Sequence, residues 1–411
     1  MINFRRYFRI EVPVIVAALV FVLAFKVGMS ALERTQTDSF SEDLAVREAY
    51  RIAHGEHSYG IVEYTHYPNG PQYVLALMMK GGITDRRQLR WAPLVFSAFC
   101  LALLGYAVCI AGANVPLSAF GIVGVGTMLV QPGIAEWMGA LYGNAYSLAI
   151  CMAGLAICLL PKCSNWVVLA LGFLSGWMGY DFTFCFLGSV VVGRLLAVAT
   201  VNTSFRDIAK SLCLTGGFAS LGVGVAIGTH FIQNAIFFGS IKTAFNDLIG
   251  SAAARAGLPV ASTLNPAYAD FIRSAALGQG RGANGEYPRF SVLADLWESF
   301  VLPKWSNYEW LVGIMYAVVT VNVCLLIVGR VHFKSWKFGI RPTLFALLGV
   351  SVSVLSGVLW VVLMPEHARF HFHFIQRQLF VPVFLTWIVL WGLCNHSWRE
   401  IRGSNRPTGL S

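Results

Sequence analysis

Long apolar runs, separated by short polar segments, occupy most of the chain. A helix that crosses a bilayer needs about 20 mainly apolar residues, and about ten runs approach that length. Another run, at 72–80, is too short to cross and is expected to lie on the membrane or dip into it. The pattern predicts an all-α polytopic membrane protein with juxtamembrane helices and a single transmembrane domain over residues 1–411. The predicted spans are 12–32, 91–111, 116–132, 144–161, 165–180, 182–200, 211–236, 309–330, 342–364 and 378–395.

Three polar segments interrupt this pattern and carry most of the candidate chemistry. The first, 33–90, begins with polar and acidic residues, continues as an amphipathic helix and reaches a Pro/Gly turn before the short apolar run. The second, 237–308, combines a helix-like SAAARAG stretch with a Gly-rich loop. The third, 365–377, is short and rich in His and Arg. We predict all three on the external face.

Composition and charge agree with a membrane protein. Hydrophobic residues make up 56% of the chain and charged residues only 12%, whereas soluble domains carry about 25% charged residues. The net charge of +10 comes from Lys and Arg that flank the spans, as they do on the cytoplasmic side of membrane proteins, so no nucleic-acid partner is expected. If both termini are cytoplasmic, all but three of the 20 acidic residues fall outside or at the outer border. The nine cysteines form no CxxC pair, which argues against a disulfide framework or a Cys zinc site.

The first external loop contains two adjacent carboxylates, Glu42 and Asp43, near its start. Either could act as a general base that takes a proton from a sugar hydroxyl. Neighbours on a helix point about 100° apart, so the two acids are expected to have different tasks. The alternative is structural, because Ser41 followed by acids is typical of a capped helix start.

A rigid turn follows in the same loop. Two prolines and a glycine come after Tyr67, and these residue types fix turns. The turn could hold Glu63 and His66 near the membrane surface. It could equally be an ordinary lead into the next apolar run, since Tyr and His are normal at membrane interfaces.

The third polar segment alternates His and Phe, which places His371 and His373 on one side of an extended strand. One interpretation is a metal site completed by His66 or a carboxylate. The favoured interpretation is anion binding by Arg369 and Arg377, because guanidinium groups match phosphate oxygens. The alternative is that both arginines only snorkel to the interface.

Other charged residues lie close to predicted spans. Arg86, Arg87 and Arg90 precede the second span and could contact phosphate or lipid headgroups equally well. Lys26, near the outer end of the first span, can snorkel to the surface. Asp181 lies between two closely spaced spans, where it either faces the site or, as the favoured interpretation, forms the hairpin turn.

The order of these features resembles the GT-C superfamily of membrane glycosyltransferases. The relatives considered are the aminoarabinose lipid A transferase and protein O-mannosyltransferases. The resemblance rests on the acids at 42–43, the helix at 49–55 and the turn at 66–73, within about the first 110 residues. It implies a GT-C-like fold and transfer of a sugar from a polyprenyl-phosphate donor to an acceptor hydroxyl on the external face, with inversion.

Site roles follow from that resemblance. The first-loop acid of the family falls on Asp43 or Glu42, and the polar residue near the turn falls on His66, with Glu63 close by. The late basic residue that binds the lipid phosphate has no exact motif here, so Arg377 and Arg369, with Arg289 from the second loop, are the candidates. Tyr67, His371 and His373 are further candidate site residues.

Two other classes of function fit a polytopic membrane protein. One is a transporter or flippase for a lipid-linked substrate, although few charges lie within the spans. The other is a membrane acyltransferase with a histidine base. In the favoured interpretation the protein resides in a bacterial inner membrane, and its partners are a polyprenyl-phosphate-linked sugar, a glycan, lipid or protein acceptor and the bilayer. No cofactor is assigned, and the one candidate cofactor is a divalent cation.

Overall fold

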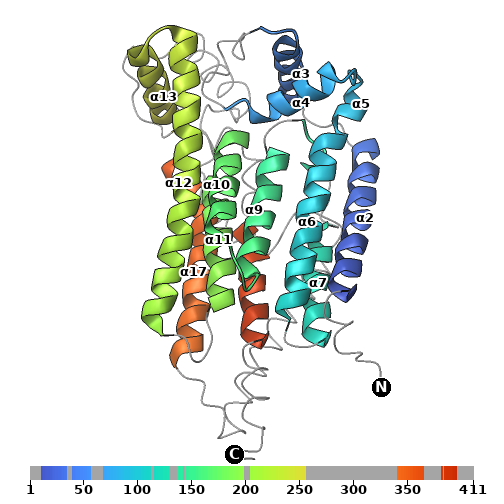
Figure 1. Cartoon of the computed structure of the whole chain (residues 1–411), viewed down its shortest axis with the longest axis vertical. Coiled ribbons are helices and arrows are strands. Elements are labelled where there is room, and N and C mark those ends of the chain that lie inside the picture. The colour runs from blue at the N-terminus through green and yellow to red at the C-terminus, as the bar shows by residue number, and fades with distance from the viewer. Residues whose placement is uncertain are drawn as a thin grey trace, which may run out of the picture.

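The protein is an all-α bundle. The computed structural model describes residues 11–34, 39–56, 68–112, 115–129, 137–141, 144–198, 204–255, 340–364, 381–382 and 384–395. These residues form α-helices and connecting turns, and they contain no strand. Figure 1 shows the long helices side by side, with α3, α4 and α5 at one end of them, which we call the α3 end.

Apolar runs predicted as spans form helices wherever the structure describes them. The bounds agree within a few residues except at α12, which begins at Phe205 rather than near 211. The predicted span at 309–330 lies outside the described residues. The helices are α2 (Glu11–Arg34), α3 (Ser39–Ala53), α4 (Gly70–Lys80), α5 (Arg86–Leu89), α6 (Trp91–Ala111), α7 (Val115–Leu129), α9 (Asn144–Leu159), α10 (Asn165–Met178), α11 (Thr183–Val198), α12 (Phe205–Phe238), α13 (Ile241–Arg255) and α17 (Ile340–Leu363), followed by helical residues 381–382 and 384–395.

Three of the described helices are long and apolar enough to cross a membrane: α2, the continuous stretch of α5 and α6, and α12. Several other apolar helices are shorter, with 16 residues in α9 and 14 in α10. At about 1.5 Å per residue, they are about 21–24 Å long, against about 30 Å for a bilayer core. The structure therefore supports a membrane-embedded helical protein, and the number of ten spans stays a prediction.

A close contact between α10 and α12 depends on glycines. A Cβ added at Gly222 of α12 would lie 2.1 Å from the carbonyl oxygen of Leu169. On the facing helix, a Cβ at Gly172 would lie 2.3 Å from the carbonyl oxygen of Ala219. Small residues allow the backbones of membrane helices to approach this closely. The interface has no room for a larger side chain at either glycine.

The layer at the α3 end consists mainly of α3 and α4. The pattern of α3 places apolar residues at i, i+4 and i+7 on one face, and this face packs on α4. Gly70, at the start of α4, approaches α10 so closely that an added Cβ would lie 2.4 Å from the carbonyl oxygen of Trp177. Pro71 follows in the first turn, where its missing N–H costs no hydrogen bond. The residues buried between the two helices are Ala45, Ala49, Ile52, Leu75 and Ala76.

The first two segments that the sequence predicts as external consist of helices joined by turns where they are described, and the third, 365–377, lies outside the described residues. The amphipathic helix of the first loop is confirmed as α3, but it begins at Ser39. Ser41 therefore lies inside the first turn and is not the helix cap considered from the sequence. The run at 72–80 forms α4, whose 11 residues are too few to cross a bilayer. The SAAARAG stretch is helical over the part that belongs to α13.

Opposite the α3 end, two cysteines lie close together at the connection between α9 and α10. The Sγ atoms of Cys158 and Cys163 are 3.8 Å apart. A hydrogen bond from Cys158 and, more weakly, the positive charge of Arg194 lower the pKa of Cys163 to about 7, against the opposing effect of partial burial. Cys163 lies in the connection outside both helices, so its thiolate is expected to be the more reactive of the pair.

The glycine contact predicts different effects for two substitutions in one helix. Gly222→Ala should destabilise the protein, because overpacking costs about 1–3 kcal/mol. Gly224→Ala is the matched control, since nothing lies within 4 Å of a Cβ added there, and Ala favours a helix over Gly by about 1 kcal/mol. Thermal unfolding of the detergent-purified variants measures both effects. Equal stability of the two variants would contradict the described interface.

The contact between Cys158 and Cys163 predicts how the reactivity of Cys163 depends on pH. The same reaction can show on which side of the membrane Cys163 lies. Alkylation of Cys163 should rise through about pH 7 and level off above it, because the thiolate is the reacting form. Arg194→Gln should move this midpoint upward. A membrane-impermeant maleimide, followed by peptide mass spectrometry, should label Cys163 in inside-out vesicles only if this end is cytoplasmic as predicted. Labelling in right-side-out vesicles alone would reverse the topology.

Candidate active site

The two adjacent acids of α3 have opposite surroundings. Glu42 has a fully buried side chain, whereas the side chain of Asp43 is 53% exposed. The difference follows from the helix, because consecutive residues point about 100° apart. Glu42 therefore faces the bundle and Asp43 faces outward, so the two carboxylates cannot share one task.

Arginines from the start of the α5–α6 segment surround Glu42. Asp85 caps α5 by accepting a hydrogen bond of 3.0 Å from the backbone N–H of Gln88, which fixes where the helix begins. Arg86 and Arg90 are four residues apart and lie on one helix face. Arg86 Nη2 lies 3.0 Å from Glu42 Oε2, and Arg90 Nη2 also donates to that oxygen.

A backbone N–H completes the environment of Glu42. The other oxygen, Oε1, accepts a hydrogen bond of 3.3 Å from the backbone N–H of Leu141. A buried carboxylate costs several kcal/mol unless such partners compensate for lost water. Two guanidinium groups and one amide thus replace the water that the Glu42 carboxylate loses inside the protein. The carboxylate ties α3 to α5, to the start of α6 and to the segment at 137–141.

Asp43 shares one of these arginines. Arg86 Nη1 lies 2.6 Å from Asp43 Oδ1, while Nη2 of the same guanidinium contacts Glu42. The side chain of Arg86 is 38% exposed, so both members of the outer pair reach solvent at the α3 end. The accessible carboxylate of Asp43 therefore lies beside the accessible guanidinium of Arg86. The buried Glu42 holds the same guanidinium through Nη2.

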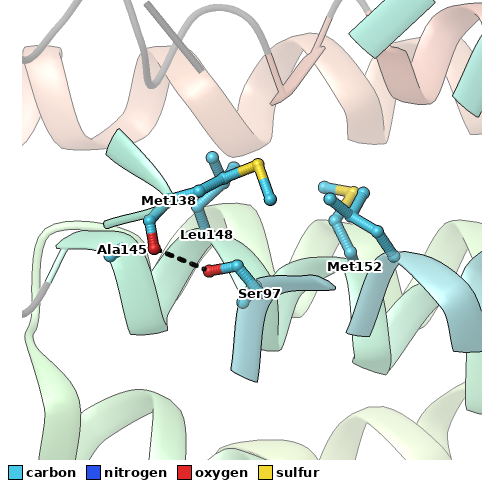
Figure 2. Close-up of a pocket in the computed structure, with 7 residues that line it drawn as sticks. Ser97, Met138, Ala145, Leu148 and Met152 are labelled. Carbon is cyan, nitrogen blue, oxygen red and sulfur yellow. Dashed lines mark hydrogen bonds between the residues drawn. The ribbon is translucent and has the colours of Figure 1, made fainter. Parts of the chain in front are cut away.

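A small apolar cavity lies beside this anchor. Ser97 Oγ donates a hydrogen bond of 3.5 Å to the carbonyl oxygen of Met138, and Figure 2 shows the cavity bounded by Met138 and Met152. Its volume of about 10 Å³ is room for about one water molecule. A sugar ring is too large to enter it.

Of the predicted site residues, the structure describes only Glu42 and Asp43, and it brings both to Arg86. Arg87, from the same basic group, is exposed and forms no ion pair within the described residues. Lys26 is exposed on α2. The predicted residues outside the described ranges are Glu63, His66, Tyr67, Arg289, Arg369, His371, His373 and Arg377.

The pairing of acids with arginines was not predicted from the sequence. Arg90 contacts a residue 48 positions earlier in the chain, and nothing local indicates that contact. The available signal was the spacing of Arg86 and Arg90, which places two cations on one helix face directly before a span. Within the described residues, no group of three or more His, Cys, Asp or Glu is close enough to hold a metal ion.

Comparisons with protein-family models, with curated proteins and with solved structures find no match for this chain. The GT-C resemblance of the first loop is therefore carried forward as a hypothesis.

Because Glu42 is buried and paired, we predict that replacing it with a neutral residue strongly destabilises the protein. Glu42→Gln removes the carboxylate that Arg90, only 14% exposed, contacts. Removing one partner of a buried pair costs about 3–5 kcal/mol. Thermal unfolding of the purified protein should show this loss. In Glu42→Gln/Arg90→Gln the loss should be smaller than the sum of the single losses, because the two residues are in contact.

Arg87→Gln is the matched control for this prediction. The residue lies between Arg86 and Arg90 and is exposed, so its removal should change stability by no more than about 0.5 kcal/mol. Additive losses in the double variant, or a control as unstable as Glu42→Gln, would contradict the anchoring role of Glu42.

Proposed function

We propose that the protein is a GT-C-type membrane glycosyltransferase that moves a sugar from a polyprenyl-phosphate donor to an acceptor hydroxyl at the α3 end of the bundle. The observation that supports this proposal most directly is the contact of 2.6 Å between the exposed Asp43 carboxylate and Arg86. Such a pair provides a proton acceptor and a phosphate-binding cation in direct contact with each other.

The proposed reaction uses the two groups on opposite sides of the transferred sugar. The acceptor oxygen attacks the anomeric carbon and forms the new bond, while the bond from that carbon to the phosphate oxygen breaks. The hydroxyl proton passes to Asp43, and the bonding electron pair leaves with the phosphate. Attack from the face opposite the leaving group inverts the anomeric configuration.

The arginine acts on the leaving group in this scheme. Guanidinium donors match phosphate oxygens in a fork geometry, and their charge stabilises the negative charge that develops on the departing phosphate. When a phosphate binds Arg86, it replaces Asp43 as the partner of Nη1, and the carboxylate can turn to the acceptor. Glu42 positions Arg86 through Nη2 and does not touch the substrate.

The setting at a membrane suits a lipid-linked donor. Apolar helices beneath the α3–α4 layer can receive a polyprenyl chain while its phosphate stays at headgroup depth. We place the α3 end on the external face of a bacterial inner membrane. The acceptor is a hydroxyl of a glycan, a lipid or a protein, and the nature of the transferred sugar is left to the assay below.

Asp43→Asn should lower transfer by at least about 10²-fold, because general-base catalysis contributes about 10²–10⁴-fold. The unfolding temperature should stay near that of the wild type, since Asp43 is exposed. The assay supplies purified protein with radiolabelled polyprenyl-phosphate sugars and membrane extracts as acceptor. Glu56→Gln is the control, because Glu56 is an exposed carboxylate of the same region, paired with Arg51.

Several outcomes would reject the proposal. Full transfer activity in Asp43→Asn would show that Asp43 is not the general base. Incorporation from a labelled acyl donor, with none from the sugar lipids, would favour an acyltransferase. Movement of a sugar lipid across vesicles without transfer would favour a flippase.

A further inference from the structure

Two thiols contact each other where α9 passes into α10. The Sγ atoms of Cys158 and Cys163 are 3.8 Å apart. Because α9 ends at Leu159 and α10 begins at Asn165, the short connection 160–164 has to reverse the direction of the chain. Pro161 lies in this connection and cannot continue the hydrogen bonding of α9. The fold itself therefore holds the two sulfur atoms in contact.

Other enclosed thiols of the bundle have partners of a different kind. Cys151 Sγ lies 3.8 Å from the carbonyl oxygen of Phe182, and Cys185 Sγ lies 3.5 Å from that of Ser356. Both cysteines bond to the main chain inside the bundle, as buried thiols with a packing role commonly do. At the connection of α9 and α10 the contact joins sulfur to sulfur, and this arrangement allows chemistry between the two side chains.

The two sulfur atoms differ in their access to water. Cys158 is 0% exposed and belongs to the last turn of α9, whereas Cys163 is half-buried and lies in the connection. A small solute from the aqueous side therefore reaches Cys163 first, and Cys158 lies behind it. A reactive thiol with a second thiol beside it is the arrangement of many redox-sensing cysteines.

A cation from α11 lies near the pair. A Cβ added at Gly193 would lie 3.0 Å from the Cβ of Cys158, so α11 approaches α9 closely at this point. The next residue is Arg194, whose Nε donates a hydrogen bond of 2.7 Å to Ser211 Oγ. The hydrogen bond from Cys158 and, more weakly, the charge of Arg194 lower the pKa of Cys163 to about 7. About half of Cys163 is then thiolate at neutral pH.

We propose that Cys163 and Cys158 form a reversible oxidation site for hydrogen peroxide. The Cys163 thiolate attacks one peroxide oxygen, the O–O bond breaks, and Cys163 becomes a sulfenic acid while hydroxide leaves. Cys158 then gives up its proton and attacks the sulfenic sulfur, which forms the disulfide and releases a second hydroxide. With the protons taken up, one peroxide is reduced to two water molecules by the two electrons of the thiol pair. This site does not depend on the proposed sugar transfer.

The second step requires only a small movement. The sulfur atoms have to approach to about 2.05 Å. Cys163 lies outside both helices, so its side chain and the connection can move while Cys158 stays in α9. Formation of the disulfide also protects Cys163 from irreversible oxidation to a sulfinic acid. In the predicted topology this end faces the cytoplasm, where the thiol pool reduces accessible disulfides.

Controlled oxidation of the full chain tests this site. The detergent-purified protein is reduced, freed of reductant and treated with hydrogen peroxide at neutral pH, and the remaining thiols are alkylated. Trypsin cleaves after Lys162 and separates the two cysteines, so mass spectrometry detects a disulfide as a linked pair of peptides. We expect Cys158 and Cys163 to lose their thiols together and to regain both on reduction. Cys213, exposed on α12, is the internal reference and should keep its thiol.

Three variants separate the roles of the cysteines. Cys158→Ser should stop at the sulfenic acid of Cys163, which dimedone traps, and should proceed to the sulfinic acid with excess peroxide. Cys163→Ser should leave Cys158 reduced, because that thiol is fully buried. Cys213→Ser is the matched control and should form the disulfide as the wild type does. Unfolding temperatures of the reduced proteins show whether each variant is folded.

The wild-type measurement decides the inference even if a variant fails to fold. A wild type that keeps both thiols under conditions that oxidise added glutathione overturns the inference. A disulfide that links two protein molecules, seen as a dimer on a non-reducing gel, also overturns it. Oxidation of Cys163 to the sulfinic acid at the same rate in the wild type and in Cys158→Ser would show that Cys158 does not capture the intermediate. Equal oxidation of Cys213 and Cys163 would show that exposure alone controls the reaction.

Discussion

The buried carboxylate of Glu42 holds the α3 end together. It receives hydrogen bonds from Arg86, Arg90 and the backbone N–H of Leu141, so one side chain joins segments that are distant in the sequence. An unpaired charge at this depth would cost several kcal/mol. The same interaction that fixes α3 on the bundle therefore also fixes the guanidinium that Asp43 contacts.

Much of the architecture follows from the apolar pattern. Bilayer thickness sets the length of a span, so the runs that the structure describes could be placed from the sequence within a few residues, except for the start of α12. The amphipathic pattern of α3 and the shortness of α4 were equally readable. The start of α3 was predicted too late in the chain, because Ser41 followed by acids is also typical of a helix start, whereas α3 begins at Ser39.

The candidate site was predictable only in part. Adjacent acids on a helix indicated that the two would have different tasks, but local sequence did not predict that Glu42 would be buried and Asp43 exposed. The pairing of Glu42 with Arg86 joins residues 44 positions apart, and it depends on how α3 folds back over the bundle.

The tight approach of Gly70 to the carbonyl of Trp177 has a mechanical consequence. A Cβ added at Gly70 would lie only 2.4 Å from that oxygen, so any larger residue at this position has to push the start of α4 away from α10. Because the apolar face of α3 packs on α4, such a shift would also disturb the helix that carries Glu42 and Asp43.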